Sequence, residues 1–363
     1  MHDQPHVRPR PERLFTFGSA GWVLLLTAVL AVVILAMTLG PALAKLPGRA
    51  PGDGRDPTTY GFDLSTCLVP RETLVAGQLH RDIHPLLVDP ATMPGASVTA
   101  HNREHYGKYL VPGDRVIGVE IAGEARAYPL MIMKLHEAAN DSLGGRPILV
   151  TYNPLCDSAI VFDRAAVSDD PADPVQFGVS GLLYNSNLLL YDRRPGAESL
   201  WSQLQARAVT GPAAEAGRRL EIVPAVLVQW GHWLAAHPDT TVLVPDVSWL
   251  RRYQETNYAT YFDSGELLFP VDPAAPEDGP PAKTRCVVVP AGAGHRVYPM
   301  PLVRERAMPA GKFRETVGER TLTFRYAQDP ETVEVTADDG PVPVVYSFWF
   351  AWHAMHPESV PER

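Results

Sequence analysis

Residues 114–133 read DRVIGVEIAGEARAYPLMIM, and this stretch predicts the fold class. VIGVEI and ARAYPL alternate well enough around a glycine to indicate two strands joined by a turn. PILVTY, residues 147–152, is a short apolar run rich in β-branched residues, as expected of a buried strand. Proline supplies 36 of the 363 residues, which argues against long helices. We therefore expect a β-rich α+β fold.

The hairpin sequence has a second occurrence. TRCVVVPAGAGHRVYPMPLV, residues 284–303, matches the first stretch in two arginines, a valine, a tyrosine and a proline, all at an offset of 170. Further matches follow in the same order, GGRPILVTY with GERTLTFRY and WLAAHPDT with WHAMHPES. The ordered matches predict two diverged copies of one strand-hairpin and helix unit, at about 114–243 and 284–360.

The two predicted copies differ in length. The interval from Tyr128 to His237 is 51 residues longer than the interval from Tyr298 to His356. The second copy also lacks recognisable counterparts of LHEAAND and NPLCDSA. Because the extra residues are polar, irregular and contain Trp and Tyr, we expect the first copy to hold the functional site. The second copy is expected to be structural.

An apolar run near the N-terminus predicts a membrane anchor. Residues 20–39 carry no charge and would span about 30 Å as a helix, the hydrocarbon thickness of a bilayer. A signal peptide cleaved after Ala44 is the alternative. Basic residues balance on the two flanks, so the orientation is predicted from the short tail and the export-like layout, which favour N-inside. The expected organisation in the cell membrane is a tail, one transmembrane helix, a linker and an extracytoplasmic domain, at 1–14, 15–40, 41–59 and 60–363.

Charge and cysteine content exclude several classes of protein. The net charge of −9 argues against a nucleic-acid partner. Cys67, Cys156 and Cys286 are too few and too widely spaced for a disulfide scaffold or a zinc motif.

TYNPLCDSA, residues 151–159, follows the predicted buried strand, where ligand-binding turns often lie. Asn153, Cys156 and Asp157 are therefore candidate binding residues. Together with His136, Cys156 and Asp157 would suit copper or zinc if the neighbouring elements are adjacent. The alternative is an Asx-Pro turn with a small buried thiol. A catalytic thiol would need a nearby cation or helix N-terminus, and the charge of Asp157 opposes this.

LHEAAND, residues 135–141, is predicted to be a short helical stretch. His136 and Asn140 would share one face of this helix, and Glu137 and Asp141 the adjoining face. We take His136, Glu137 and Asp141 as candidate ligand-binding residues. The alternative is a solvent-facing helix whose end leads into the Leu-Gly-Gly turn.

FGVSGLLY, residues 177–184, contains Ser180 in Gly-x-Ser-Gly, which fails the spacing of a nucleophile elbow. Gly178 and Gly181 are instead predicted to mark a tight strand crossing. The following segment combines aromatic and hydrogen-bonding groups, which suit a small-molecule pocket or, equally, a buried polar network. The candidate binding residues in this part of the chain are Ser180, Tyr184, Asp192, Arg193, Trp201 and Gln203.

These motifs resemble the bacterial domain-of-unknown-function 3179 family over about residues 60–360. The resemblance rests on ARAYPLMIMKLHEAANDSLGGRPILVTYNPLCDSAIVFDR, FGVSGLLYNSNLLLYDRRPGAESLWSQ and FWFAWHAMHP. The family usually has Trp-His-Glu where this chain has Leu135-His136-Glu137. It usually has Tyr-Cys-Pro-Leu-Cys-Gly where this chain has Asn153 in place of the first thiol, which excludes a two-cysteine redox cycle within this turn. The resemblance implies no established activity.

The leading functional hypothesis is a membrane-anchored, extracytoplasmic binding protein for a metal ion or a small redox ligand. The alternative is a structural or assembly subunit that joins other subunits of a membrane complex. An enzyme is the third and least favoured hypothesis, because no nucleophile–base constellation is visible. Clustering of His136, Cys156 and Asp157 in one cleft would favour binding, whereas dispersal into separate packed turns would favour a structural role.

Overall fold

The computed structural model describes residues 21–44, 50–104, 109–170, 172–292 and 294–362. Contacts divide the chain into two compact units, residues 1–50 and residues 51–363. The predicted tail, 1–14, lies outside the described residues, as do 15–20 of the predicted transmembrane segment and 45–49 of the predicted linker.

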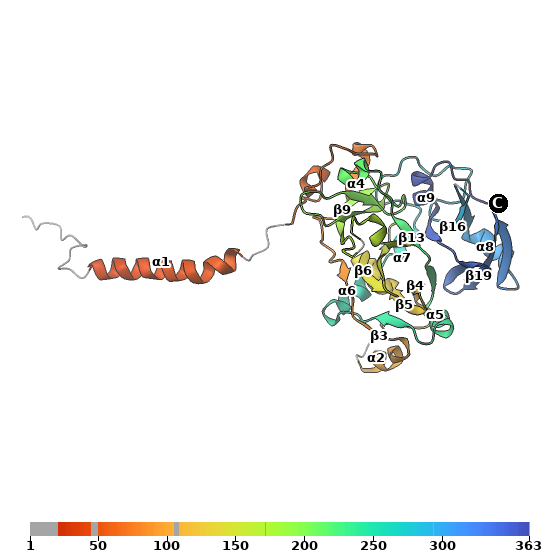
Figure 1. The fold of residues 1–363 in the computed structure, drawn as a ribbon, viewed down its shortest axis with the longest axis horizontal. Coiled ribbons are helices and arrows are strands. Elements are labelled where there is room, and N and C mark those ends of the chain that lie inside the picture. The colour runs from red at the N-terminus through yellow and green to blue at the C-terminus, as the bar shows by residue number, and fades with distance from the viewer. Residues whose placement is uncertain (1–20, 45–49, 105–108, 171, 293, 363) are drawn as a thin grey trace, which may run out of the picture. The chain divides into compact units, whose positions relative to one another are not determined.

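The first unit contains the helix α1, Gly21–Ala44 (Figure 1). This helix contains no charged residue, and its described large apolar side chains, between Trp22 and Met37, are exposed. Within the described residues, no helix is long and apolar enough to cross a membrane. The transmembrane helix therefore stays a prediction.

The described part of the second unit contains three β-sheets. The five-stranded sheet has the order β1-β9-β10-β11-β12, with bounds Leu74–Ala76, Phe177–Tyr184, Asn187–Asp192, Leu200–Ser202 and Arg207–Ala208. The eight-stranded sheet has the order β17-β16-β22-β8-β7-β6-β2, with β13 on β8. Its bounds in that order are Gly294–Pro299, Arg285–Ala291, Val345–Phe348, Ser158–Asp163, Arg146–Asn153, Ala138–Leu143, Leu87–Val88 and Glu221–Val223.

The nine-stranded sheet has the order β18-β19-β20-β14-β4-β5-β15-β3, with β21 on β20. Its bounds in that order are Lys312–Val317, Arg320–Gln328, Glu331–Ala337, Val226–Gln229, Arg115–Ile121, Glu124–Pro129, Thr241–Leu243, Thr92–Pro94 and Gly340–Pro341. The β-rich α+β prediction is confirmed.

The helices of the second unit are short, as the proline content predicted. The α-helices α2 to α9 span Val98–Glu104, Leu130–His136, Gly211–Glu215, Trp230–Ala236, Leu250–Glu255, Ala259–Asp263, Met300–Ala307 and Trp349–Met355. Single 3₁₀ turns lie at Pro57–Tyr60, Arg71–Thr73, Gly95–Ser97, Ala165–Val167 and Val247–Trp249.

The two predicted hairpins pair in the same register. Val116 faces Pro129 in β4 and β5, and Cys286 faces Pro299 in β16 and β17, so both partners are shifted by 170. The third strand of each sheet also matches, because β14 pairs with β4 as β22 pairs with β16. A helix follows each hairpin directly, α3 in one case and α8 in the other.

In two of the sheets, strands from the N-terminal half of the second unit (up to about residue 243) pair with strands from its C-terminal half (from about residue 284). Strands β6, β7 and β8 join β22 through the pair Ala159 and Tyr346, while β18, β19 and β20 join β14 through Val333 and Leu227. These pairings place segments that are distant in sequence side by side. Residues 312–337 form the antiparallel run of β18, β19 and β20.

Strand β7 lies between two apolar cores. Ile148 and Val150 belong to one core, and Leu149 belongs to the other. A strand that is covered on both faces needs apolar residues at consecutive positions, which explains why PILVTY lacks alternation.

The predicted helix over LHEAAND is wrong beyond its second residue. Helix α3 ends at His136, and β6 begins at Ala138. Glu137 adopts a left-handed φ of 59° and caps α3 by donating its N–H to the Met133 carbonyl. Its own carbonyl accepts from the Tyr152 N–H, which directs the chain into the sheet. Asp141 therefore lies on a buried strand rather than on an exposed helix.

Candidate ligand-binding site

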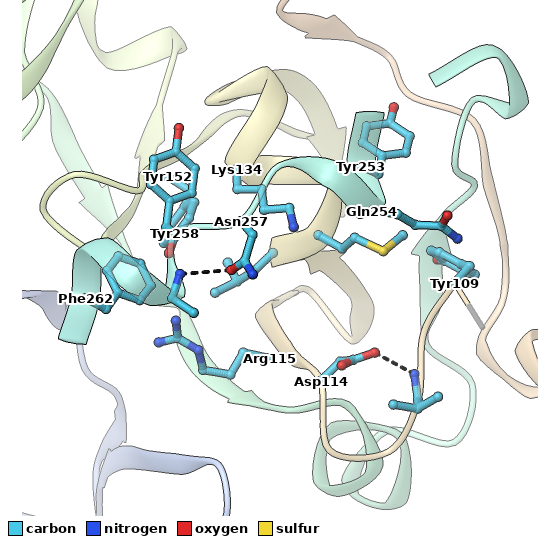
Figure 2. Close-up of a pocket in the computed structure, with 14 residues that line it drawn as sticks. Tyr109, Asp114, Arg115, Lys134, Tyr152, Tyr253, Gln254, Asn257, Tyr258 and Phe262 are labelled. Carbon is cyan, nitrogen blue, oxygen red and sulfur yellow. Dashed lines mark hydrogen bonds between the residues drawn. The ribbon is translucent and has the colours of Figure 1, made fainter. Parts of the chain in front are cut away.

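A cavity of about 520 Å³ lies where α3 and the start of β4 meet the segment from α6 to α7 (Figure 2). We call it the Lys134 cavity. Its polar groups come from Asp114, Arg115, Lys134, Gln254 and Asn257, and its aromatic rings from Tyr109, Tyr152, Tyr253, Tyr258 and Phe262. Its volume falls in the range of small-molecule sites, which combine apolar walls with a few fixed polar groups.

Lys134 supplies a cation without a partner. Figure 2 shows its side chain pointing into the cavity beside Asn257. Within the described residues its ammonium group forms no hydrogen bond or ion pair. Burial lowers the pKa of Lys134, and the negative charge of Asp114 only partly opposes this shift. Asp114 forms no ion pair with Lys134, and its carboxylate accepts the Val111 N–H at 2.7 Å.

The other cation of the cavity, Arg115, is fully paired. Two of its nitrogens donate to the two carboxylate oxygens of Asp157, each at 3.0 Å. Arg285 adds a third hydrogen bond to Asp157 at 2.6 Å, and the Tyr152 hydroxyl adds a fourth at 2.7 Å. Burial raises the pKa of Asp157, but the two guanidinium groups outweigh it and hold the pKa well below its usual range. Asp157 is therefore a structural anion.

His136 lies behind the cavity wall and does not line the cavity. Its Nδ1 is 2.6 Å from the Pro85 carbonyl, which can only accept, so Nδ1 carries the proton. Its Nε2 then accepts from the Tyr253 hydroxyl at 2.7 Å. Burial lowers the pKa of His136, which favours this neutral form. Both ring nitrogens are occupied, and the residue positions Tyr253.

Cys156 lies in the second apolar core, away from the Lys134 cavity. Its thiol contacts the Ser186 carbonyl at 3.3 Å, and burial raises the pKa of Cys156 far above its usual range. The Asn153 side-chain oxygen accepts the N–H groups of Leu155 and Cys156, which is the geometry of an Asx turn. This geometry matches the structural alternative for NPLCDSA.

The three candidate metal ligands do not converge. His136 bonds Tyr253, Cys156 bonds a backbone carbonyl, and Asp157 binds two arginines. Across the described part of the chain, no group of three or more His, Cys, Asp or Glu side chains is arranged to hold a metal ion.

Glu137 lies beside the cavity wall and binds Gln78. The Gln78 amide donates to a Glu137 carboxylate oxygen at 3.0 Å. Burial raises the pKa of Glu137 to about 7, and this hydrogen bond opposes the shift only partly. The charge of Glu137 adds to burial in raising the pKa of Tyr258, so the carboxyl group lies near a ring of the cavity.

The remaining predicted residues form buried networks outside the Lys134 cavity. Asp141 accepts from Arg126 at 2.6 Å and from the Tyr128 hydroxyl at 2.8 Å. Asp192 accepts from the Trp201 indole at 3.1 Å, and Gln203 bonds the Ser158 hydroxyl at 2.7 Å. These contacts match the polar-network alternative for this segment.

Three further candidates from the same segment also lie away from the cavity. Ser180 donates to the Leu189 carbonyl at 2.6 Å, and Arg193 pairs with Asp82 at 2.8 Å. Tyr184 packs in the second core. Gly181 allows a close approach of a bend rather than of a strand, because a Cβ atom added there would lie 2.9 Å from the His80 carbonyl.

Sequence reasoning missed most of the cavity. Lys134 was the available signal, since it is a lone cation inside the apolar run LMIMKLH. The rings and amides between Tyr253 and Phe262 gave no signal, because only the tertiary fold brings them to α3.

The fold and the cavity define a β-rich α+β domain with a small, polar-centred pocket. The chain belongs to the family described as protein of unknown function (DUF3179), whose model matches residues 90–340. This confirms the resemblance seen in the sequence. No curated protein and no solved structure matches the chain.

Proposed function

We propose that this protein is a membrane-anchored, extracytoplasmic binding protein for a small organic carboxylate, which it holds in the Lys134 cavity. The observation that carries the proposal is the unpaired, half-buried ammonium group of Lys134. A buried charge is costly unless an opposite charge approaches it. A ligand carboxylate would supply that charge and accept a charge-assisted hydrogen bond.

The other half of the protein supports this reading. Lys134 is the fifth residue of α3, and Arg304 is the fifth residue of α8. Arg304 lies 3.8 Å from Glu331, which also accepts from the Tyr326 hydroxyl. In the first half, Asp157 corresponds to Glu331, because it accepts from the Tyr152 hydroxyl as Glu331 accepts from Tyr326. Its carboxylate oxygens already bind Arg115 and Arg285. Lys134 is thus left without the partner that Arg304 has.

The walls of the cavity limit the ligand further. One unpaired cation balances one negative charge, so a monocarboxylate fits better than a phosphate dianion. Five aromatic rings provide surface for a planar or apolar body. The side-chain amides of Gln254 and Asn257 can add neutral hydrogen bonds.

Benzoate and benzamide test the proposal as a pair, because they differ in charge but hardly in shape. Binding to the full-length protein in detergent would be measured by calorimetry. We expect benzoate to bind at least tenfold more tightly than benzamide and Lys134→Met to abolish this preference. Arg304→Met is the matched control and should retain it. Equal binding of both probes, or no saturable binding of either at millimolar concentration, would contradict the proposal.

The affinity for benzoate should also depend on pH. The ammonium group binds a carboxylate only while it is protonated, and burial lowers the pKa of Lys134. Affinity should therefore fall as the pH rises through that lowered pKa. In Lys134→Arg the fall should be absent, because a guanidinium group stays charged.

A structural or assembly role in a membrane complex is the second candidate. The dispersal of His136, Cys156 and Asp157 into separate packed contacts favours it. Affinity purification of the full-length protein from its native membranes tests this role. A stoichiometric partner that remains bound to Lys134→Met would favour assembly over ligand binding.

We propose that the two halves of the second unit are diverged copies of one ancestral unit. The matched registers of the hairpins and of their third strands support this. An experimental structure with different strand connectivity in the two halves would contradict the duplication.

A further inference from the structure

A second cavity lies beside α9, separate from the Lys134 cavity. Its volume is about 420 Å³, and the segments 276–280 and 357–362 form its other walls. Trp349 and His353 line it from one face of the helix, with their ring centroids 5.1 Å apart. None of the predicted site residues lines this cavity.

Both helix residues carry a buried nitrogen without a partner. Trp349 is 0% exposed, and its indole Nε1 has no hydrogen-bond acceptor within the described part of the chain. The His353 Nδ1 is likewise buried and unpartnered. Buried polar atoms in native proteins nearly always have a partner. Two such atoms belong to residues that line the same cavity wall.

Two other indole N–H groups of the same protein donate hydrogen bonds to its own side chains. Trp352 donates to the Ser359 hydroxyl at 3.1 Å, and Trp233 donates to the Thr240 hydroxyl at 2.9 Å. Trp349 differs because the chain beside its Nε1 is Gly279, where an added Cβ atom would lie 3.4 Å from this nitrogen. Glycine offers no side-chain acceptor to this nitrogen.

The chemistry of the walls points to an uncharged ligand. Proline and valine supply the apolar surface, at Pro276, Pro280, Pro357, Val360 and Pro361. The charged residues among the described lining are both acidic, Asp278 and Glu362, so an anion is disfavoured. An indole N–H needs an acceptor, and a neutral histidine can donate from Nδ1. We propose that this cavity binds a small neutral ligand that presents an amide carbonyl oxygen to Trp349 and His353.

The test uses two probes of matched shape, the neutral N-acetylproline methylamide and the anionic N-acetylproline. They would be titrated into ¹⁵N-labelled full-length protein in detergent while the indole N–H resonances are followed by NMR. The resonance of Trp349 is assigned by its loss in Trp349→Phe, which also removes the donor. The Trp233 resonance is the internal control, because that indole already has an acceptor.

We expect the neutral probe to move the Trp349 resonance saturably and to bind at least tenfold more tightly than the anion. His353→Leu should weaken the neutral probe and leave the Trp233 resonance in place. A Trp349 resonance that neither probe moves, or that both move at equal concentrations, would overturn the proposal. Because the Lys134 cavity prefers a carboxylate, Lys134→Met should leave this titration unchanged.

Discussion

Arg285 donates a hydrogen bond of 2.6 Å to the same Asp157 carboxylate that Arg115 binds through two nitrogens. The two arginines are 170 residues apart and are the first residues of β16 and β4. Asp157 belongs to the turn between β7 and β8, which join the sheet of β16 through β22. One carboxylate thus connects the first residues of two strands from different sheets.

Replacing Asp157 should destabilise the fold strongly. Asp157→Asn keeps the shape but leaves Arg115 without its counter-charge in a buried position. The expected loss is about 3–5 kcal/mol in the free energy of unfolding, measured by urea denaturation. Glu255→Gln is the control, because it breaks the exposed pair with Arg251 and should cost less than about 1 kcal/mol. A loss of similar size in both variants would contradict the role given to Asp157.

The same carboxylate should contribute to acid sensitivity. Its folded pKa is held below the unfolded value of about 3.9, so its stabilisation is present above that pH and is lost as the pH falls through the folded pKa. The stability difference between wild type and Asp157→Asn should therefore shrink below about pH 4.

Glu137 should have the opposite dependence on pH. Its folded pKa of about 7 lies above its usual value of 4.5, so the stability associated with it is lost as the pH rises through the folded pKa. Glu137→Gln removes this loss and keeps an acceptor for Gln78. We expect the variant to be more stable than wild type by on the order of 2–3 kcal/mol at about pH 9 and equal at about pH 4. Denaturation at the two pH values checks this, and a variant that is less stable at high pH would refute it.

The three thiols should differ in reactivity. Cys156 and Cys286 are buried, and burial raises the pKa of each thiol, whereas Cys67 is partly exposed. In the folded protein, iodoacetamide should therefore modify Cys67 first and the other two only after unfolding. Mass spectrometry of the alkylated peptides shows the order in which the three cysteines are modified. Rapid modification of folded Cys156 at neutral pH would show that it is a low-pKa thiolate.

Cys156→Ser should leave the fold nearly intact. The serine hydroxyl is similar in size and can donate to the Ser186 carbonyl that the thiol contacts at 3.3 Å. The variant should lose less than about 2 kcal/mol in urea denaturation. Benzoate binding should not change, because Cys156 does not line the Lys134 cavity. A variant that folds but fails to bind benzoate would contradict this placement.

The apolar N-terminal run should keep the protein in the membrane. Residues 20–39 carry no charge, and a helix of this length matches the bilayer core. We expect the intact protein in the membrane fraction, with residues after 60 open to protease added outside the cytoplasm. N-terminal sequencing is the decisive measurement. A soluble form that begins at Lys45 would show that the run is a cleaved signal peptide.

Local patterns were sufficient for the elements whose residues carry their own signal. Alternation around Gly123 predicted the β4–β5 hairpin, and the unbroken run PILVTY predicted a buried strand. The predicted helix over LHEAAND was wrong, although the local sequence is compatible with a helix. The backbone of Glu137 instead takes a left-handed conformation, stabilised by bonds to Met133 and Tyr152.

The sequence by itself determined the β-rich class, the family and the recurrence of the hairpin, because these depend on periodicity and on residues that are adjacent in the chain. Only the tertiary structure decided the site. It engaged His136, Cys156 and Asp157 in separate contacts and brought Lys134 against rings from 253–262. The reason is physical: whether a polar side chain is free to bind a ligand depends on which distant groups satisfy it, and only the tertiary fold brings those groups together.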